Sequence, residues 1–138
     1  MDVAILEDTR DIADAIRLIE EYYDLSDLIY VEDDRDLSEH ILDNCMVIEF
    51  FKDDAILGYT LIEWTDYEKR HCCAHFCAFE TVNMLKAFSL LRQSLQGIAK
   101  AIKAEVPKFK DKALKIIKSL GFEVKDLDDK MVEVFIVV

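Results

Sequence analysis

The chain has 138 residues, of which 52% are hydrophobic and 33% charged, so it holds enough apolar material for the core of one globular domain. Its formal net charge of −12 argues against nucleic acid as the main partner. No apolar run approaches the ~20 residues that span a bilayer, and the acidic start lacks the features of a signal peptide. We therefore expect a single cytoplasmic domain over residues 1–138, without a membrane partner.

The charge is distributed unevenly along the chain. Residues 1–54 hold 18 acidic and 4 basic residues, a net charge of −14, whereas residues 86–118 hold 9 basic and 2 acidic, a net charge of +7. A basic segment of this kind can bind a polyanion or an acidic protein surface, or it can be a solvated helix face. We expect a protein partner or a second copy of the chain to bind seven lysines, here named the basic ridge: Lys100, Lys103, Lys108, Lys110, Lys112, Lys115 and Lys118.

The chain opens with a predicted strand and two helices. Val3–Leu6 is a short apolar strand, and Glu7-Asp8-Thr9 can cap the helix that follows. Apolar residues at helical spacing predict both helices, with Asp33-Asp34 between them. The first helix carries Ile12, Ala13, Ile16, Ile19 and Tyr23, and the second carries Leu37, Ile41 and Leu42 and ends near Asn44.

Three strands rich in β-branched and aromatic residues follow, at Met46–Lys52, Ala55–Trp64 and His71–Phe79. Asp53-Asp54 joins the first two as an antiparallel hairpin. A long helix is then predicted over Val82–Lys103, because apolar residues that include Leu91, Leu95 and Ile98 recur there at helical spacing. We expect these three side chains to be nearly fully buried.

The chain is predicted to end with strand, helix and hairpin. Ala104–Val106 is a short strand, and Pro107 suits the first turn of the last helix. That helix carries Ala113, Ile116, Ile117 and Leu120, and Gly121 supplies the left-handed residue that closes it. Glu123–Asp126 and Met131–Val138 form the closing hairpin, with the last strand buried on both faces.

The segment before this hairpin carries a family pattern: Glu-Val-Pro, then Ala113-Leu114, then Leu120-Gly121-Phe122. It resembles the last helix of the GNAT N-acyltransferase superfamily, where Ala-Leu-x-x-Tyr-x-x-x-Gly-Phe is common. The predicted order, β-α-α-β-β-β-α-β-α-β-β, is also that of the superfamily. The resemblance implies a GNAT-like α/β fold with a mixed sheet, and the first two helices would then shape the acceptor side.

The resemblance further implies a site for acetyl-coenzyme A, but the matching residues differ from the family pattern. GNAT enzymes hold the pyrophosphate in the turn before the long helix, with the pattern Arg/Gln-x-x-Gly-x-Gly/Ala, because glycines let the backbone come close and the helix start attracts anions. Here that turn is Glu80–Leu85, which has no glycine and adds an acidic residue. Ser94–Ala99 is spelled similarly, but it is expected deep inside the long helix.

The family's other functional positions also differ in this chain. The tyrosine that the family often uses as a general acid aligns with Ile117, and the asparagine common before the last helix aligns with Lys110. We therefore expect acetyl-coenzyme A to bind weakly or not at all. If the chain does bind it, the candidate cofactor-binding residues are Lys108, Lys110 and Lys112.

The strand before the glycine-free turn carries the remaining chemically suggestive residues. Alternation places His71, Cys73, His75 and Cys77 on one side, but four such residues span ~20 Å and cannot share one metal ion. We therefore expect no metal site. We expect all four cysteines of the chain to be reduced thiols that fill space: Cys45, Cys72, Cys73 and Cys77. His75 and Glu80 are the candidate catalytic bases beside an acceptor amine.

Two functions follow from this sequence. The first is a non-catalytic GNAT-like module that binds protein, loosely similar to small GNAT-like proteins of tailed bacteriophages, some of which belong to the particle; the chain would then be located in a viral particle. The second is an acetyl-coenzyme A-dependent N-acyltransferase acting on an amine. The sequence favours the first, because the glycine turn and the tyrosine are both missing.

Overall fold

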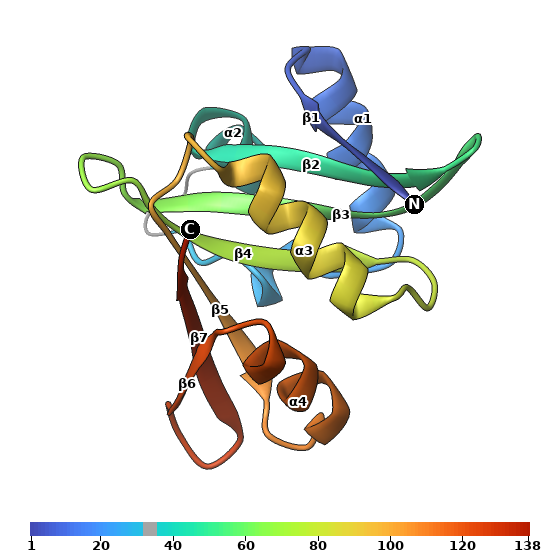
Figure 1. Ribbon diagram of the computed structural model, residues 1–138. Coiled ribbons are helices and arrows are strands. Elements are labelled where there is room, and N and C mark those ends of the chain that lie inside the picture. The colour runs from blue at the N-terminus through green and yellow to red at the C-terminus, as the bar shows by residue number, and fades with distance from the viewer. Residues whose placement is uncertain (32–35) are drawn as a thin grey trace. The chain divides into compact units, whose positions relative to one another are not determined.

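The computed structural model describes residues 1–31 and 36–138 (Figure 1), so Asp33 and Asp34 lie outside the described residues. Within these ranges the chain forms seven strands and four α-helices. In chain order they are β1 (Asp2–Leu6), α1 (Thr9–Glu20), the 3-10 turn η1 (Leu25–Asp27), α2 (Leu37–Asn44), β2 (Cys45–Lys52), β3 (Ala55–Asp66), β4 (His71–Ala78), α3 (Met84–Leu95), β5 (Ala101–Pro107), α4 (Asp111–Ser119), β6 (Glu123–Asp126) and β7 (Met131–Val137). The predicted order of elements is therefore confirmed.

The described residues divide into two compact units. The first comprises Met1–Glu63 and His75–Thr81, and the second comprises Trp64–Ala74 and Val82–Val138. Strands β3 and β4 run through both units, and the strand order is β1-β2-β3-β4-β5-β7-β6. The α/β class with a mixed sheet is confirmed, whereas the expectation of a single domain over residues 1–138 stays a prediction.

In the first unit, antiparallel strands carry two amphipathic helices. β1 pairs with β2, and β2 pairs with β3 through a hairpin that turns at Asp53-Asp54 as predicted. The carboxylate of Asp8 accepts a hydrogen bond from the backbone N–H of Arg10 at 2.7 Å, which confirms the predicted cap of α1. The apolar stripes of α1 and α2 pack into one core with residues of β2, β3 and β4: Ala15, Ile16, Ile19, Leu25, Ile29, Ile41, Val47, Tyr59, Leu61 and Cys77.

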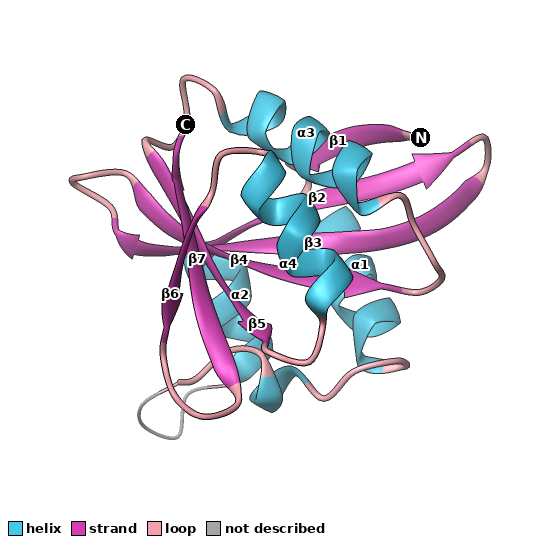
Figure 2. Ribbon diagram, turned by 60° about the horizontal axis from the view of Figure 1, so that its bottom comes forward, coloured by secondary structure: helices cyan, strands magenta, loops and turns pink. Residues whose placement is uncertain are grey.

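In the second unit, β5 pairs in parallel with His71–Cys73 of β4, and its other edge pairs antiparallel with β7. β6 completes the closing hairpin beside β7, as Figure 2 shows for these strands. α4 ends where it was predicted to end, because Gly121 takes a φ of +92 and lets the chain reverse. The rings of Phe88 on α3 and Phe122 meet edge to face, with centroids 5.6 Å apart.

The predicted end of the long helix was wrong. α3 stops at Leu95, and Gly97 takes a φ of +80 just beyond it, so Ser94–Ala99 runs out of the helix instead of lying inside it. The backbone N–H of Lys100 donates to the carbonyl of Arg70 at 2.8 Å, and the residues after it join the sheet as β5. Leu91 and Leu95 are buried as expected, but Ile98 is only half-buried. Strand pairing with β4 therefore outweighs the helical periodicity.

Two smaller expectations also need correction. Pro107 is the last residue of β5, and α4 begins only at Asp111, because the backbone N–H of Lys108 still donates to the carbonyl of Lys130 at 2.8 Å. β7 alternates regularly, with Val132, Val134 and Ile136 buried and their neighbours half-buried or exposed, so one face of this strand is buried and not both. Among the described residues, no helix is long and apolar enough to cross a membrane.

Candidate functional site

The first unit contains a carboxylate held between two imidazoles. Oε1 of Glu63 on β3 lies 3.2 Å from Nε2 of His75 on β4, and Oε2 lies 3.2 Å from Nε2 of His40 on α2. The three side chains are only 15–20% exposed. Three elements that are far apart in the sequence therefore meet at one charged group.

Local sequence explains how His40 reaches this position. Asp36 accepts a hydrogen bond from the backbone N–H of Ser38 at 2.9 Å and so starts α2. Ile41, next to His40, is fully buried and fixes the orientation of the helix against the core. At the end of the same helix, Asn44 bonds back to His40. The helix thus presents His40 to β3 and supports it one turn later.

The hydrogen bonds place a proton on the same nitrogen of both rings. A carboxylate only accepts hydrogen bonds, so both Nε2 atoms that face Glu63 carry a proton. Nδ2 of Asn44 lies 3.1 Å from the carbonyl oxygen of His40 and 3.2 Å from Nδ1 of the same residue. Because the carbonyl requires the amide N–H₂ group at that place, Nδ1 of His40 faces a donor and is the acceptor of this second contact.

Glu63 is ionised at neutral pH. The hydrogen bond from His75 holds the pKa of its carboxyl group below the usual value, and the bond from His40 acts in the same direction, against the opposing effect of burial. A partly buried carboxylate with a perturbed pKa and two imidazole donors is a candidate functional site. Chemically, this arrangement can orient His75 as a base.

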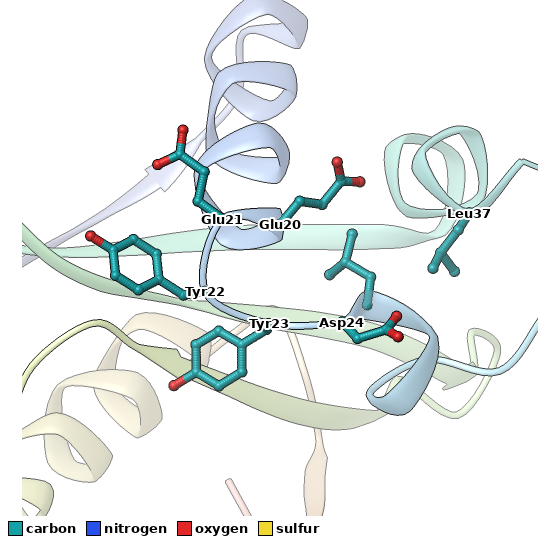
Figure 3. A pocket seen from close by; sticks show the side chains of 7 residues that line it. Glu20, Glu21, Tyr22, Tyr23, Asp24 and Leu37 are labelled. Atoms are coloured by element: carbon teal, nitrogen blue, oxygen red, sulfur yellow. The ribbon is translucent and has the colours of Figure 1, made fainter.

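An open hollow lies beside the end of α1 (Figure 3). Its volume is about 540 Å³, and the residues that line it are Glu20, Glu21, Tyr22, Tyr23, Asp24, Leu25 and Leu37. Figure 3 shows the side chains of Glu20 and Asp24 extending toward the side of Leu37, with the two tyrosine rings on the other side. The lining thus combines three carboxylates with two aromatic rings, which suits a cation.

Asp24 in the acidic lining is held by a local turn. Hydrogen bonds from the hydroxyl and the backbone N–H of Ser26 hold the pKa of the Asp24 carboxyl below its usual value. On the opposite side, the hydroxyl of Tyr23 donates to the carbonyl of Ala78 at the end of β4, and Tyr22 stacks on Phe79 with centroids 4.5 Å apart. The hollow is therefore fixed to the strand that carries His75.

Two structural links connect the hollow to the Glu63 cluster. Leu37 lines the hollow and His40 follows three residues later on α2, which is about 4.5 Å of helix rise. Tyr23 contacts β4 at Ala78, three residues beyond His75. Both groups belong to the first unit.

The structure places the sequence-predicted bases differently. His75 joins the Glu63 cluster, whereas Glu80 follows the end of β4 and is exposed to solvent. Cys77 and Cys72 are buried, and burial raises the pKa of each thiol to about 12, so neither is a nucleophile at neutral pH. In the part of the chain that the structure describes, no three His, Cys, Asp or Glu side chains are placed to hold a metal ion.

The lysines proposed for the cofactor lie around the start of α4. Nζ of Lys108 is 3.5 Å from a carboxylate oxygen of Asp126, while Lys110 and Lys112 are exposed. Phe109, between the first two, is 79% exposed. The role of these lysines stays a prediction.

The turn that the family pattern uses for pyrophosphate does not fit that group here. It holds no glycine, Glu80 is exposed in it, and the side chain of Asn83 already accepts a hydrogen bond from the backbone N–H of Lys86 at the start of α3. An anion at this helix start would compete with Asn83 and be repelled by Glu80. We therefore assign no residue of this turn to a donor molecule.

Sequence reasoning missed Glu63, His40 and Asn44. Glu63 could have been noticed as the one charged residue within 55–65 of β3, and His40 and Asn44 as polar residues four apart on one helix. Their meeting depends on how α2 packs on β3, which no local pattern indicates.

Comparisons with solved structures identify the fold. A spermidine N-acetyltransferase of Vibrio cholerae matches with a TM-score of 0.68 and 17% sequence identity, over 99% of this chain and 95% of the other. A ribosomal-protein-alanine N-acetyltransferase of Brucella melitensis matches with a TM-score of 0.64 and 12% identity, over 100% of both chains. An acetyltransferase of Bacillus subtilis, solved in complex with coenzyme A, matches with a TM-score of 0.61 and 12% identity, over 99% of this chain and 98% of the other.

No protein-family model matches the sequence, and no curated protein matches it either. The structural matches extend over nearly the whole chain and confirm the predicted fold. The three structures named above are bacterial acetyltransferases, and they give no support to the resemblance to phage proteins, which stays a prediction.

Proposed function

We propose, from the GNAT fold that this chain shares with these acetyltransferases, that it is an N-acyltransferase acting on an amine, with acetyl-coenzyme A as the acyl donor. The observation that carries the proposal is the pairing of His75 with Glu63 at 3.2 Å. An amine must lose a proton to become a nucleophile, and this pair supplies a base. The sequence alone favours a non-catalytic module, and the paired base is the reason to prefer the enzyme.

His75 is the base in this proposal. Its Nε2–H is donated to Glu63, so the lone pair of the neutral ring lies on Nδ1. Nδ1 takes the proton of the ammonium group, directly or through one water molecule, and the ring becomes an imidazolium. The ionised Glu63 stabilises this positive charge, and the released amine is the nucleophile.

The acceptor in this proposal is a cationic amine that binds in the acidic hollow. Glu20, Glu21 and Asp24 attract positive charge, and the rings of Tyr22 and Tyr23 add cation–π attraction. A polyamine fits this chemistry, because one ammonium group can bind in the hollow while another reaches the base. The Vibrio cholerae structure named above is a spermidine N-acetyltransferase, which supports the choice of spermidine as the first probe.

The test is whether the chain acetylates spermidine with acetyl-coenzyme A. The rate is measured from the free thiol of coenzyme A that the reaction releases. We expect the wild type to turn over, and we expect His75→Ala to lower the rate at least tenfold. The double variant Glu20→Gln, Asp24→Asn should mainly raise the KM for spermidine. A peptide with N-terminal alanine serves as a second acceptor. If neither amine is acetylated while the protein is folded, the proposed function is wrong.

A non-catalytic binding module is the second candidate, and the poor fit of the turn at Glu80 favours it. Calorimetry with acetyl-coenzyme A separates the two candidates. The enzyme requires measurable binding, with a dissociation constant in the micromolar range, which is roughly −8 kcal/mol. The absence of binding at millimolar ligand, together with no turnover, favours the module.

A further inference from the structure

The Glu63 cluster extends beyond the base itself to His40 and to the end of α2, which the proposed proton transfer does not use. His40 contacts the carboxylate on the oxygen opposite to the one that His75 uses. Asn44 in turn contacts His40 through both its ring and its carbonyl. The three bonds form one chain from the end of α2 to the base on β4.

The direction of every proton in this chain is determined. Asn44 donates to Nδ1 of His40, His40 donates from Nε2 to Oε2 of Glu63, and His75 donates from Nε2 to Oε1. If His40 rotated or changed tautomer, Oε2 would lose a donor and the carboxylate could turn away from His75. Because Glu63 accepts the Nε2 proton of His75, the orientation of this carboxylate bears on the tautomer of His75, and His40 helps to set that orientation.

We infer that His40 and Asn44 are positioning residues that fix the Nε2–H tautomer of His75 by locking Glu63. The inference rests on the proposed function, because the base is needed only if an amine is acylated. It adds that helix α2, which also lines the acidic hollow through Leu37, holds the base in its active tautomer.

Histidine ring spectra test this inference directly, because the chain has only three histidines, His40, His71 and His75. The ¹⁵N chemical shifts of the ring nitrogens distinguish the two neutral tautomers. In the wild-type chain at pH 8 we expect His40 and His75 both as the Nε2–H form. In His40→Leu we expect His75 to become a mixture of tautomers, and kcat for spermidine to fall about tenfold with little change in KM.

The conservative variant His40→Gln is the matched control. Its amide N–H₂ group reaches about where Nε2 of histidine lies, so it keeps a donor for Glu63 and should restore the His75 tautomer and most of kcat. A variant that only damaged packing would not show this selective rescue. His71→Gln assigns the third ring and should leave His75 unchanged.

If His40→Leu fails to fold, Asn44→Leu replaces it in the experiment, because Asn44 is half-exposed at the helix end. Its loss should raise the fraction of His40 in the other neutral tautomer, with the proton on Nδ1. The inference is overturned if the His75 tautomer is the same in wild type and in the variant that removes the donor. The ring spectra do not need turnover. A wild type that acetylates no amine would therefore refute the proposed function, while the spectra still decide whether His40 and Asn44 set the tautomer.

Discussion

Glu63 should contribute to stability only where it is ionised. Its two imidazole donors hold the pKa of the folded carboxyl below the usual 4.5. A lowered folded pKa gives stability that is fully present above the unfolded pKa and is lost as the pH falls through the folded pKa. We therefore expect Glu63→Gln to be clearly less stable than wild type at pH 7, and the difference to shrink toward pH 3.

Urea unfolding at pH 7, 5 and 3 measures this difference. Glu68→Gln is the control, because Glu68 is exposed in the turn between β3 and β4 and its variant should follow wild type at every pH. A stability difference for Glu63→Gln that stays constant from pH 7 to pH 3 would show that the charge of Glu63 has no part in it.

Gly58 is needed because of its close neighbours and not because of its backbone angles. A Cβ atom at this position would lie 2.6 Å from the carbonyl oxygen of Cys77 and 2.9 Å from Cα of Ala78, both backbone atoms of β4. Gly58→Ala should therefore destabilise the protein by about 1–3 kcal/mol. Thermal unfolding followed by circular dichroism measures this loss.

Gly97 provides the contrast to Gly58. It has a φ of +80, but an added Cβ would meet nothing within 4 Å. Gly97→Asn should cost about 1 kcal/mol or less, since asparagine tolerates the left-handed region. Equal losses at the two positions would show that crowding against β4 is not what requires glycine at 58.

At the scale of the element, α3 is held by the residues that face the core. Leu95 is fully buried, so Leu95→Ala should cost about 2–5 kcal/mol. Ile98 lies beyond the helix and is half-buried, so Ile98→Ala should cost less than half as much. Chemical denaturation of both variants gives the comparison, and equal losses would mean that Ile98 packs as the helical pattern predicted.

Local signals predicted most of the elements. Asp8 before α1, Asp53-Asp54 between β2 and β3, and Gly121 after α4 are determined by short-range chemistry, and each lies where the sequence indicated. The α3–β5 boundary could not be predicted, because Ile98, Ala99 and Ile102 suit a helix as well as a loop and strand. Pairing of β5 with β4 decides between them, and that contact is distant in sequence.

The candidate site divides in the same way. His75 could be chosen from the sequence, because a histidine in a strand is readily recognised as a possible base. Glu80, the other predicted base, is exposed to solvent just after β4. The actual partner, Glu63, is reached across a strand pair, and the support from His40 comes from a helix whose packing no short pattern specifies.

At the scale of the whole molecule, the uneven charge leads to a prediction about anions. If the lysines of the basic ridge contribute to binding of coenzyme A, the double variant Lys110→Gln, Lys112→Gln should weaken it severalfold at 0.1 M salt. The effect should fade toward 1 M salt, because the Debye length shrinks from ~10 Å to ~3 Å. Calorimetry at both salt concentrations measures the two affinities.

The control removes the same charge elsewhere. Lys52 and Lys125 are exposed and lie outside the basic ridge, so replacing both with glutamine should leave the affinity nearly unchanged. If the two double variants weaken binding equally, only the net charge matters. If neither changes it, the ridge remains a candidate surface for an acidic protein alone, and the cofactor role of Lys110 and Lys112 is refuted.

The division of β3 and β4 between the two units has a consequence for how the protein folds during synthesis. The first unit needs residues 75–81, so it cannot close when residue 63 leaves the ribosome. Residues 64–74 emerge in between, and they belong with segments that are made later. In a nascent chain that stops after residue 74, the first unit lacks its last strand segment, and with it Cys77 of its core. The edge of β3 that would pair with this segment is then exposed. Ribosome-bound chains of increasing length should become protease-resistant only once residue 81 and those just beyond it are clear of the exit tunnel.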